Sequence, residues 1–209
     1  ENDKYYNFCI SYKDYETYKR DGANVDKLLV CPNGAQHRDY HFTEKPLKPS
    51  WTLYLGRIEP RKRQYLYQDI YGVEFVGKYT DTTSFDRNRD CYLGQWEHEY
   101  KLQHVTDYGN MMLLSDGENG TPLVIKEALV AGLGVVVSKY AAHDLDTSLP
   151  FVTVIPDDKW EDIEYVQMKL IENRKISVTM RKEIRQYGVD NFSWQKLVKT
   201  YVENIEGME

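Results

Sequence analysis

Short apolar runs alternate with helical segments between residues 51 and 155. The runs are WTLYLG, VEFVG, CYLG, MMLLS, GVVVS and FVTVI. Runs of this length are typical of strands buried on both faces, and their alternation with helices is typical of a parallel sheet with crossover helices. We therefore predict an α/β fold in which a Rossmann-like parallel sheet is flanked by helices. Ligands of such sheets bind at the carboxyl ends of the strands.

The C-terminal part of the chain predicts two helices. Residues 157–184 have mixed helical periodicity after Pro156. The segment SWQKLVKTYVENI begins with Ser193, a candidate N-cap, and ends before Gly207.

The first fifty residues have a different pattern. They predict a strand, a short helix that closes at Gly22, and a second strand that runs into Pro32-Asn33-Gly34. The polar, proline-bearing segment HFTEKPLKPS follows as a linker. We expect residues 1–50 to be the end of a preceding unit and residues 51–209 to be the main domain.

Length, charge and cysteine usage narrow the class of protein. The chain has 209 residues, enough to bury a substantial core, and its net charge of −6 argues against sequence-independent binding to nucleic acid. Cys9, Cys31 and Cys91 lack any C-x-x-C spacing, so we expect neither a disulfide framework nor a metal site, in a reducing, cytoplasmic setting. No apolar run approaches the roughly 20 residues that span a bilayer, and no signal-peptide pattern opens the sequence.

A basic stretch, YLGRIEPRKRQ, is the first candidate site. A predicted strand ends at Gly56, and Arg57, Arg61, Lys62 and Arg63 follow it. Glycine lets a ligand approach the backbone, and four cations within seven residues could hold a dianion such as a diphosphate. A solvated basic face is the alternative.

The second candidate is the stretch DGENGTPLVIKEALVAG. Its glycine-rich loop leads into a helix that begins near Pro122 or Leu123, and free N–H groups at a helix start attract anions. Glu127 lies about one turn inside this helix. If it faces the cleft, its carboxylate can accept hydrogen bonds from the vicinal hydroxyls of a ribose. If it faces outward, it is an ordinary solvated glutamate.

The third candidate, YLGQWEHEYKL, places Gly94 at a strand end, followed by Gln95 and Trp96. An amide and an aromatic ring there could frame a nucleobase, or Trp96 could simply cover the edge of the sheet. His98 is interpreted as a surface histidine. The sequence has no H-x-x-x-H pattern, nucleophile elbow, Walker lysine or G-x-G-x-x-G fingerprint, which argues against zinc hydrolases, α/β-hydrolases, P-loop NTPases and nicotinamide dehydrogenases.

Taken together and in this order, the motifs resemble the C-terminal, nucleotide-sugar-binding half of GT-B glycosyltransferases, most closely the retaining family 4. The resemblance covers nearly the whole chain. Gly56, Arg57 and Lys62 match a strand that ends in Gly-Arg with a lysine five residues after the arginine. GTPLVIKEALVAG matches the loop and the Glu-Ala-x-x-x-Gly helix that follow a later strand, and VCPNGA and NFSWQKLVKTY are similar to further segments of the family.

The resemblance implies roles for these residues. Arg57 and Lys62 would hold the donor diphosphate, and Glu127 would bind the donor ribose; these three are the expected catalytic residues. The whole expected donor-binding set is Gly56, Gly94, Gln95, Glu118, Asn119, Gly120, Thr121, Pro122, Leu123, Val124, Ile125 and Glu127.

The chain departs from the family in two places. The family's first glutamate stands eight positions before the second, which falls on Asn119 here, with Glu118 one residue too early. Either Asn119 or Glu118 would therefore meet the transferred sugar. The acceptor-binding half of the family also has no counterpart beyond the elements of residues 1–50.

The leading hypothesis is a metal-independent, retaining glycosyltransferase, or its donor-binding domain. It would transfer a sugar from a nucleoside diphosphate sugar, most simply a UDP-sugar, to a hydroxyl of a glycan or lipid, and the acceptor could bring it to a membrane surface. Two alternatives stay open: a non-catalytic module that needs a separate acceptor domain or subunit, and a protein similar to nucleotide-sugar epimerases.

Overall fold

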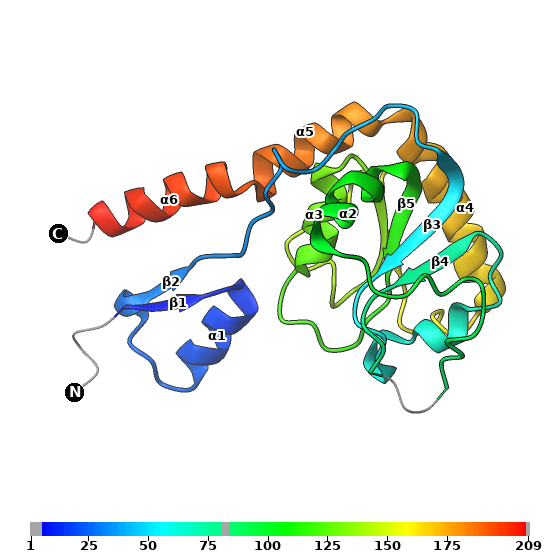
Figure 1. The fold of residues 1–209 in the computed structure, drawn as a ribbon. Helices are drawn as coiled ribbons and strands as arrows, with labels where there is room; N and C mark the ends of the chain where they lie inside the picture. The colour runs from blue at the N-terminus through cyan, green and yellow to red at the C-terminus, as the bar shows by residue number, and fades with distance from the viewer. Residues whose placement is uncertain (1–5, 81–83, 208–209) are drawn as a thin grey trace.

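The computed structural model describes residues 6–80 and 84–207, so the first five residues of the predicted N-terminal segment lie outside it. Its main feature is a sheet of five parallel strands in the order β4-β3-β5-β6-β7 (Figure 1). The strands are β3 (Lys48–Leu55), β4 (Val73–Val76), β5 (Tyr108–Leu113), β6 (Gly134–Ser138) and β7 (Val152–Ile155). The predicted α/β fold with a parallel sheet is confirmed.

The predicted strand CYLG is wrong. Tyr92 forms a single bridge with Phe75 of β4, and the segment joins no further ladder. The carbonyl oxygen of Gly94 still accepts from the Gly77 N–H, but Gly94 has φ +75°, and this left-handed conformation does not continue a strand. The chain then enters the short helix α2 (His98–His104).

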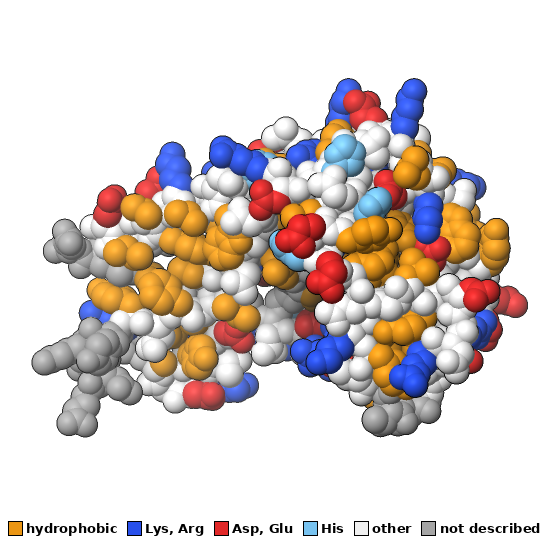
Figure 2. All heavy atoms as spheres, viewed as in Figure 1, with side chains coloured by type: hydrophobic (Ala, Val, Ile, Leu, Met, Phe, Trp, Pro, Cys, Tyr) orange, Lys and Arg blue, Asp and Glu red, His pale blue; other side chains and the backbone are white. Residues whose placement is uncertain are grey.

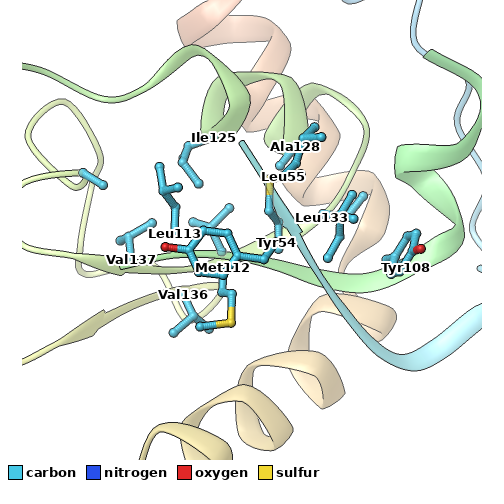
Figure 3. Close-up of a cluster of buried hydrophobic side chains, with 14 of the residues drawn as sticks. Tyr54, Leu55, Tyr108, Met112, Leu113, Ile125, Ala128, Leu133, Val136 and Val137 are labelled. Carbon is cyan, nitrogen blue, oxygen red and sulfur yellow. The ribbon is translucent and has the colours of Figure 1, made fainter. Parts of the chain in front are cut away.

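Helices cover both faces of the sheet. The helix α3 (Leu123–Val130) lies on one face and α4 (Ile163–Thr179) on the other (Figure 1). Ile125 and Ala128 of α3 point toward the side chains of β3 and β5, of which Leu55 and Leu113 are labelled in Figure 3. All of these side chains are at least nine-tenths buried, which explains the continuous apolar runs of the sequence.

The C-terminal part contains three described helices rather than the two predicted. The pattern of residues 157–184 is divided at Met180, which separates α4 from α5 (Arg181–Phe192). The third helix, α6 (Trp194–Glu206), begins at Ser193 as predicted, and the Ser193 hydroxyl accepts a hydrogen bond from the Lys196 N–H. The helix α5 crosses α3 at Gly188, where a Cβ would lie 2.6 Å from the carbonyl carbon of Leu129.

The mixed periodicity of α4 comes from polar side chains that face the sheet. Asn173 donates to the carbonyl oxygens of Val135 and Phe151, and Arg174 donates to those of Ser50 and Gly72. These acceptors lie in or just before the first residues of strands. Such a helix has no clean apolar stripe, because its buried face supplies hydrogen bonds as well as packing.

The first residues form a small unit of β1 (Asn7–Cys9), α1 (Tyr12–Arg20) and β2 (Leu28–Val30), as predicted. Its two strands pair in parallel. The helix α6 lies beside this unit (Figure 1), and the Tyr201 hydroxyl of α6 donates to the carbonyl oxygen of Pro32. Four short 3-10 helices complete the described elements: η1 (Val25–Lys27), η2 (Pro60–Lys62), η3 (Gln64–Tyr67) and η4 (Val105–Asp107). Within residues 6–80 and 84–207, every helix is too short or too polar to cross a bilayer.

Arg181 at the start of α5 is 2% exposed. Its guanidinium donates to the carbonyl oxygens of Thr43 (2.9 Å), Tyr108 (2.9 Å) and Thr106 (2.6 Å), and lies 3.5 Å from that of Ala131. Burial lowers its pKa to about 10, so it stays charged at neutral pH. One side chain thus joins the linker, the start of β5, the end of α3 and α5.

We expect Arg181→Met to lower the free energy of unfolding by about 3 kcal/mol or more, because each buried carbonyl left without a donor costs about 1–3 kcal/mol. Urea denaturation measures the change. Lys182→Met is the matched control, since the Lys182 side chain is 69% exposed and its loss should change stability by less than about 0.5 kcal/mol. Equal stability of the two variants would contradict the role given to Arg181.

Candidate functional site

The strand order places the candidate site at one edge of the sheet. The order reverses between β3 and β5, and ligands of doubly wound sheets bind at such a reversal, beyond the carboxyl ends of the strands. The loop after β3 and the loop after β5 meet there, and the Asp116 N–H donates to the carbonyl oxygen of Arg61 at 2.8 Å.

Hydrogen bonds to the backbone hold the loop after β3. Gln64 is 1% exposed; its amide donates to the carbonyl oxygen of Arg57 and its oxygen accepts from the Glu59 N–H. The Tyr54 hydroxyl donates to the carbonyl oxygen of Lys62 and accepts from the Leu114 N–H, so it also joins this loop to β5. The basic residues therefore stand on a fixed frame.

Three of the four cations converge on the carboxylate of Glu59. Its Oε1 lies 2.9 Å from Nε of Arg61 and 3.5 Å from Nζ of Lys62, and its Oε2 lies 3.9 Å from Nη1 of Arg57. Lys62 folds back so that its Nζ would stand 3.2 Å from a Cβ at Gly56. The missing side chain of Gly56 thus leaves room for the Lys62 ammonium.

Arg63, the fourth cation, points elsewhere. Its guanidinium lies over the ring of Trp160, 4.0 Å from the centroid, and 3.6 Å from the carboxylate of Asp116. Its φ of +56° turns the side chain out of the row formed by Arg61 and Lys62. Arg63 therefore does not contact Glu59 with the other three cations.

The loop after β5 leads into the start of α3. Asp144 and Thr121 hold this turn by a reciprocal pair: the Thr121 N–H donates to Oδ2 of Asp144 at 3.1 Å, and the Asp144 N–H donates to Oγ1 of Thr121 at 3.0 Å. Pro122 is the N-cap residue, as the sequence predicts within one position. The first N–H groups of the helix, those of Leu123 and Val124, have no helical acceptor and point toward the loop.

A pocket of about 310 Å³ opens beside this loop. Six expected donor-binding residues line it: Glu118, Asn119, Gly120, Thr121, Pro122 and Leu123. Arg61 of the basic stretch lines it as well, together with four residues to which the sequence gave no role: Gly117, Lys126, Ile10 and Asn33. Ile10 and Asn33 come from the N-terminal unit, and the Lys13 ammonium donates to the carbonyl oxygen of Glu118 at 3.1 Å. The N-terminal unit thus forms one wall.

Lys126 is the buried cation that sequence reasoning missed. It is 3% exposed, its Nζ donates to the carbonyl oxygen of Asn33 at 3.1 Å, and Oδ2 of Asp144 lies 3.8 Å away. Burial lowers its pKa. The sequence does show a lysine inside an apolar helix, one residue before Glu127. It does not show that this lysine meets the carbonyl oxygen of Asn33, which lies far away in the chain.

Glu127 is 7% exposed, so it is not a solvated helix glutamate. Its Oε1 accepts from Nζ of Lys101 on α2 at 2.8 Å, while its buried Oε2 has no hydrogen-bond partner among the described residues. The buried hydroxyl of Tyr40 also has no hydrogen-bond partner among the described residues. Burial and the neighbouring Glu127 carboxylate raise its pKa. Glu127 does not line the pocket beside the Gly117–Thr121 loop.

Gly94 lies at the same edge of the sheet as Gly56. The Gly77 N–H donates to the carbonyl oxygen of Gly94 at 2.9 Å, and a Cβ at Gly77 would stand 2.0 Å from the carbonyl oxygen of Gly56. Gln95 is exposed. Trp96 packs between Tyr100 and Tyr108, which agrees with its covering role.

Nine of the expected residues thus fall into three groups rather than one pocket; Gly56, Gly94, Gln95, Val124 and the buried Ile125 belong to none of them. Arg57 and Lys62 gather at Glu59, the residues from Glu118 to Leu123 line the pocket, and Glu127 pairs with Lys101. Across residues 6–80 and 84–207, no group of three His, Cys, Asp or Glu side chains is placed to hold a metal ion.

The chain was compared with known proteins. No protein-family model and no curated protein matches it. Solved structures do: HepE from Anabaena in complex with UDP-glucose superposes with a TM-score of 0.72 at 14% identity, over 96% of this chain and 63% of HepE. The lipopolysaccharide outer core galactosyltransferase WaaB gives 0.71 at 17% identity, over 98% of this chain and 62% of WaaB.

A third match is the sucrose-phosphate synthase from Thermosynechococcus elongatus, with a TM-score of 0.70 at 16% identity, over 96% of this chain and 57% of the synthase. The chain therefore spans less than two thirds of the length of each of these proteins. The likeness shows that this chain has the Rossmann-like fold of one half of a GT-B glycosyltransferase.

Proposed function

We propose that the chain is the donor-binding half of a retaining glycosyltransferase related to family 4, and that it takes its sugar from a UDP-sugar. The observation that carries this proposal is a group of three cations, Arg57, Arg61 and Lys62, at the reversal of strand order, in which Arg61 lines the same pocket as the start of α3. A diphosphate needs positive charge and free N–H groups together, and both are present at this edge. HepE, which shares the fold, was solved with UDP-glucose.

In the proposed reaction, the bond between the anomeric carbon and the diphosphate oxygen breaks, and an acceptor hydroxyl of a glycan or lipid forms the new bond. Negative charge grows on the departing diphosphate. Arg57, Lys62 and the N–H groups at the start of α3 would stabilise it, and preorganised charge of this kind is commonly the largest catalytic contribution. Because protein cations neutralise the leaving group, we propose that the reaction requires no added divalent metal.

Glu127 is proposed to bind the ribose of the donor. Its Oε2, which has no hydrogen-bond partner among the described residues, can accept a hydrogen bond from a hydroxyl, while the contact of Oε1 with Nζ of Lys101 orients the carboxylate. Glu118 and Asn119 are proposed to meet the transferred sugar. Arg61 lies 3.3 Å from Oε1 of Glu118, so this carboxylate is held beside the cations.

We propose that transfer also needs an acceptor-binding unit, as a further domain or a separate subunit. Hydrophobic side chains gather along α6 and the neighbouring unit (Figure 2). The large hydrophobic residues exposed there include Phe8, Ile10, Val198, Val202 and Ile205. A contiguous apolar face of this kind is typical of a surface that another domain or protein covers.

In the protein combined with its acceptor-binding unit, we expect Lys62→Ala to lower the turnover of UDP-glucose by about 10²–10³-fold, because one charge-stabilising group at the leaving group is lost. Its effect on uridine binding should be small, since uridine carries no phosphate. Release of UDP, with and without EDTA, measures turnover. Lys169→Ala on α4 is the control, and unchanged turnover in Lys62→Ala would refute the assignment.

A thermal-shift panel of UDP, GDP, ADP and TDP tests the base. The bound diphosphate should stabilise the protein by about 2.7 kcal/mol at a hundredfold excess over Kd. UDP is expected to give the largest shift and uridine a much smaller one. The absence of a shift with all four diphosphates would exclude a donor site of this kind.

The need for an acceptor-binding unit is tested on the chain alone. We expect it to bind UDP-glucose in calorimetry but to hydrolyse or transfer the sugar at most slowly, because the proposal places the acceptor site on a further unit. Full transfer activity of the chain alone would contradict this part of the proposal and leave the donor site intact.

A further inference from the structure

Glu59 holds a position that the proposed function does not explain. A carboxylate would repel a bound diphosphate, yet that of Glu59 lies within 4 Å of Arg57, Arg61 and Lys62, the three cations that should attract one. Its side chain is only 18% exposed, against 62% for Arg57 and 48% for Arg61. It therefore stands in the middle of the cationic group rather than at its rim.

The loop does not need this carboxylate for its shape. The hydrogen bonds that fix the loop run through Gln64 to the backbone of Arg57 and Glu59, and through Tyr54 to the carbonyl oxygen of Lys62. Glu59 takes part in the loop's hydrogen bonds through its backbone alone: its N–H donates to Gln64 and its carbonyl oxygen accepts from the Lys62 N–H, and any residue except proline would keep both. The cations would thus remain gathered after the carboxylate charge is removed.

The contacts of Glu59 resemble those that a phosphate oxygen would make. Its Oε1 is shared between Nε of Arg61 and Nζ of Lys62, as one oxygen of an anion would be. A diphosphate that enters the same group of cations must share them with Glu59 or displace its carboxylate, because two anions at one cationic site repel each other. The second carboxylate on Arg61, that of Glu118, belongs to the pocket wall and meets Arg61 alone among the three cations.

We propose that Glu59 is an internal anion that occupies the cation site of the free protein and competes with the donor diphosphate for it. The inference rests on the proposed function, since it takes the cation group to be the diphosphate site. Glu59 then sets the affinity for nucleoside diphosphates. It weakens the binding of donor and of released UDP alike, which favours departure of the product.

Glu59→Gln tests this, because the amide keeps the shape of the side chain and removes its charge. We expect the Kd for UDP, measured by calorimetry, to fall about three- to tenfold, the range that corresponds to the loss of a few partly exposed charge contacts. The Kd for uridine should not change. Glu44→Gln removes an equal charge from an ion pair with Lys182 outside the site, 2.9 Å long and mostly exposed, and should leave both constants unchanged.

A second variant controls for new hydrogen bonds that the amide of Glu59→Gln could form. Glu59→Ala removes all three contacts and should tighten UDP binding in the same direction. Unchanged or weaker UDP binding in both variants, with wild-type binding intact, would overturn the inference and show that Glu59 orients the cations instead. If the wild-type protein and both variants fail to bind UDP, GDP, ADP and TDP, the proposed function fails as well.

Discussion

A parallel sheet buried on both faces leaves carbonyl groups at the amino ends of its strands that need hydrogen-bond donors inside the protein. In this fold, side chains of α4 and α5 supply them. Arg181 reaches the carbonyls around the start of β5, Arg174 those at the start of β3 and before β4, and Asn173 those around β6 and β7. Both arginines are more than nine-tenths buried, although no carboxylate forms an ion pair with either of them in the described part of the chain.

This constraint separates the two edges of the sheet. The amino edge is closed by hydrogen bonds whose loss would cost stability. The carboxyl edge carries charges instead, and there Arg57, Arg61 and Lys62 lie within 4 Å of the carboxylate of Glu59. Carboxylate contacts can be exchanged for contacts with a ligand anion, whereas the carbonyl contacts of Arg181 cannot. The hydrogen bonds that stabilise the fold and the charged groups of the candidate site thus lie at opposite ends of the same strands.

Much of the fold could be predicted because the periodicity of the chain follows burial. Five apolar runs became the five strands, and the loop before Leu123 became the start of α3. The predicted strand at CYLG failed because a short apolar run indicates burial but not pairing, and the segment forms one bridge before the left-handed conformation of Gly94. The division of the helical region at Met180 was missed because the buried face of α4 is partly polar, so the sequence shows no change of pattern there.

The same distinction applies to the candidate site. The sequence by itself determined which groups stand at strand ends and helix starts, because spacing along the chain sets these positions: Gly56, Arg57, Lys62 and the loop before Leu123. Only the tertiary structure decided which partners those groups meet. Three such contacts are those of Glu59 with the cations, Lys101 with Glu127, and Lys126 with Asn33. They depend on the direction of a side chain or on segments that are far apart in the chain. Hydrophobic periodicity carries no information on such pairs, since a charged side chain finds its partner only after the backbone has brought the two together.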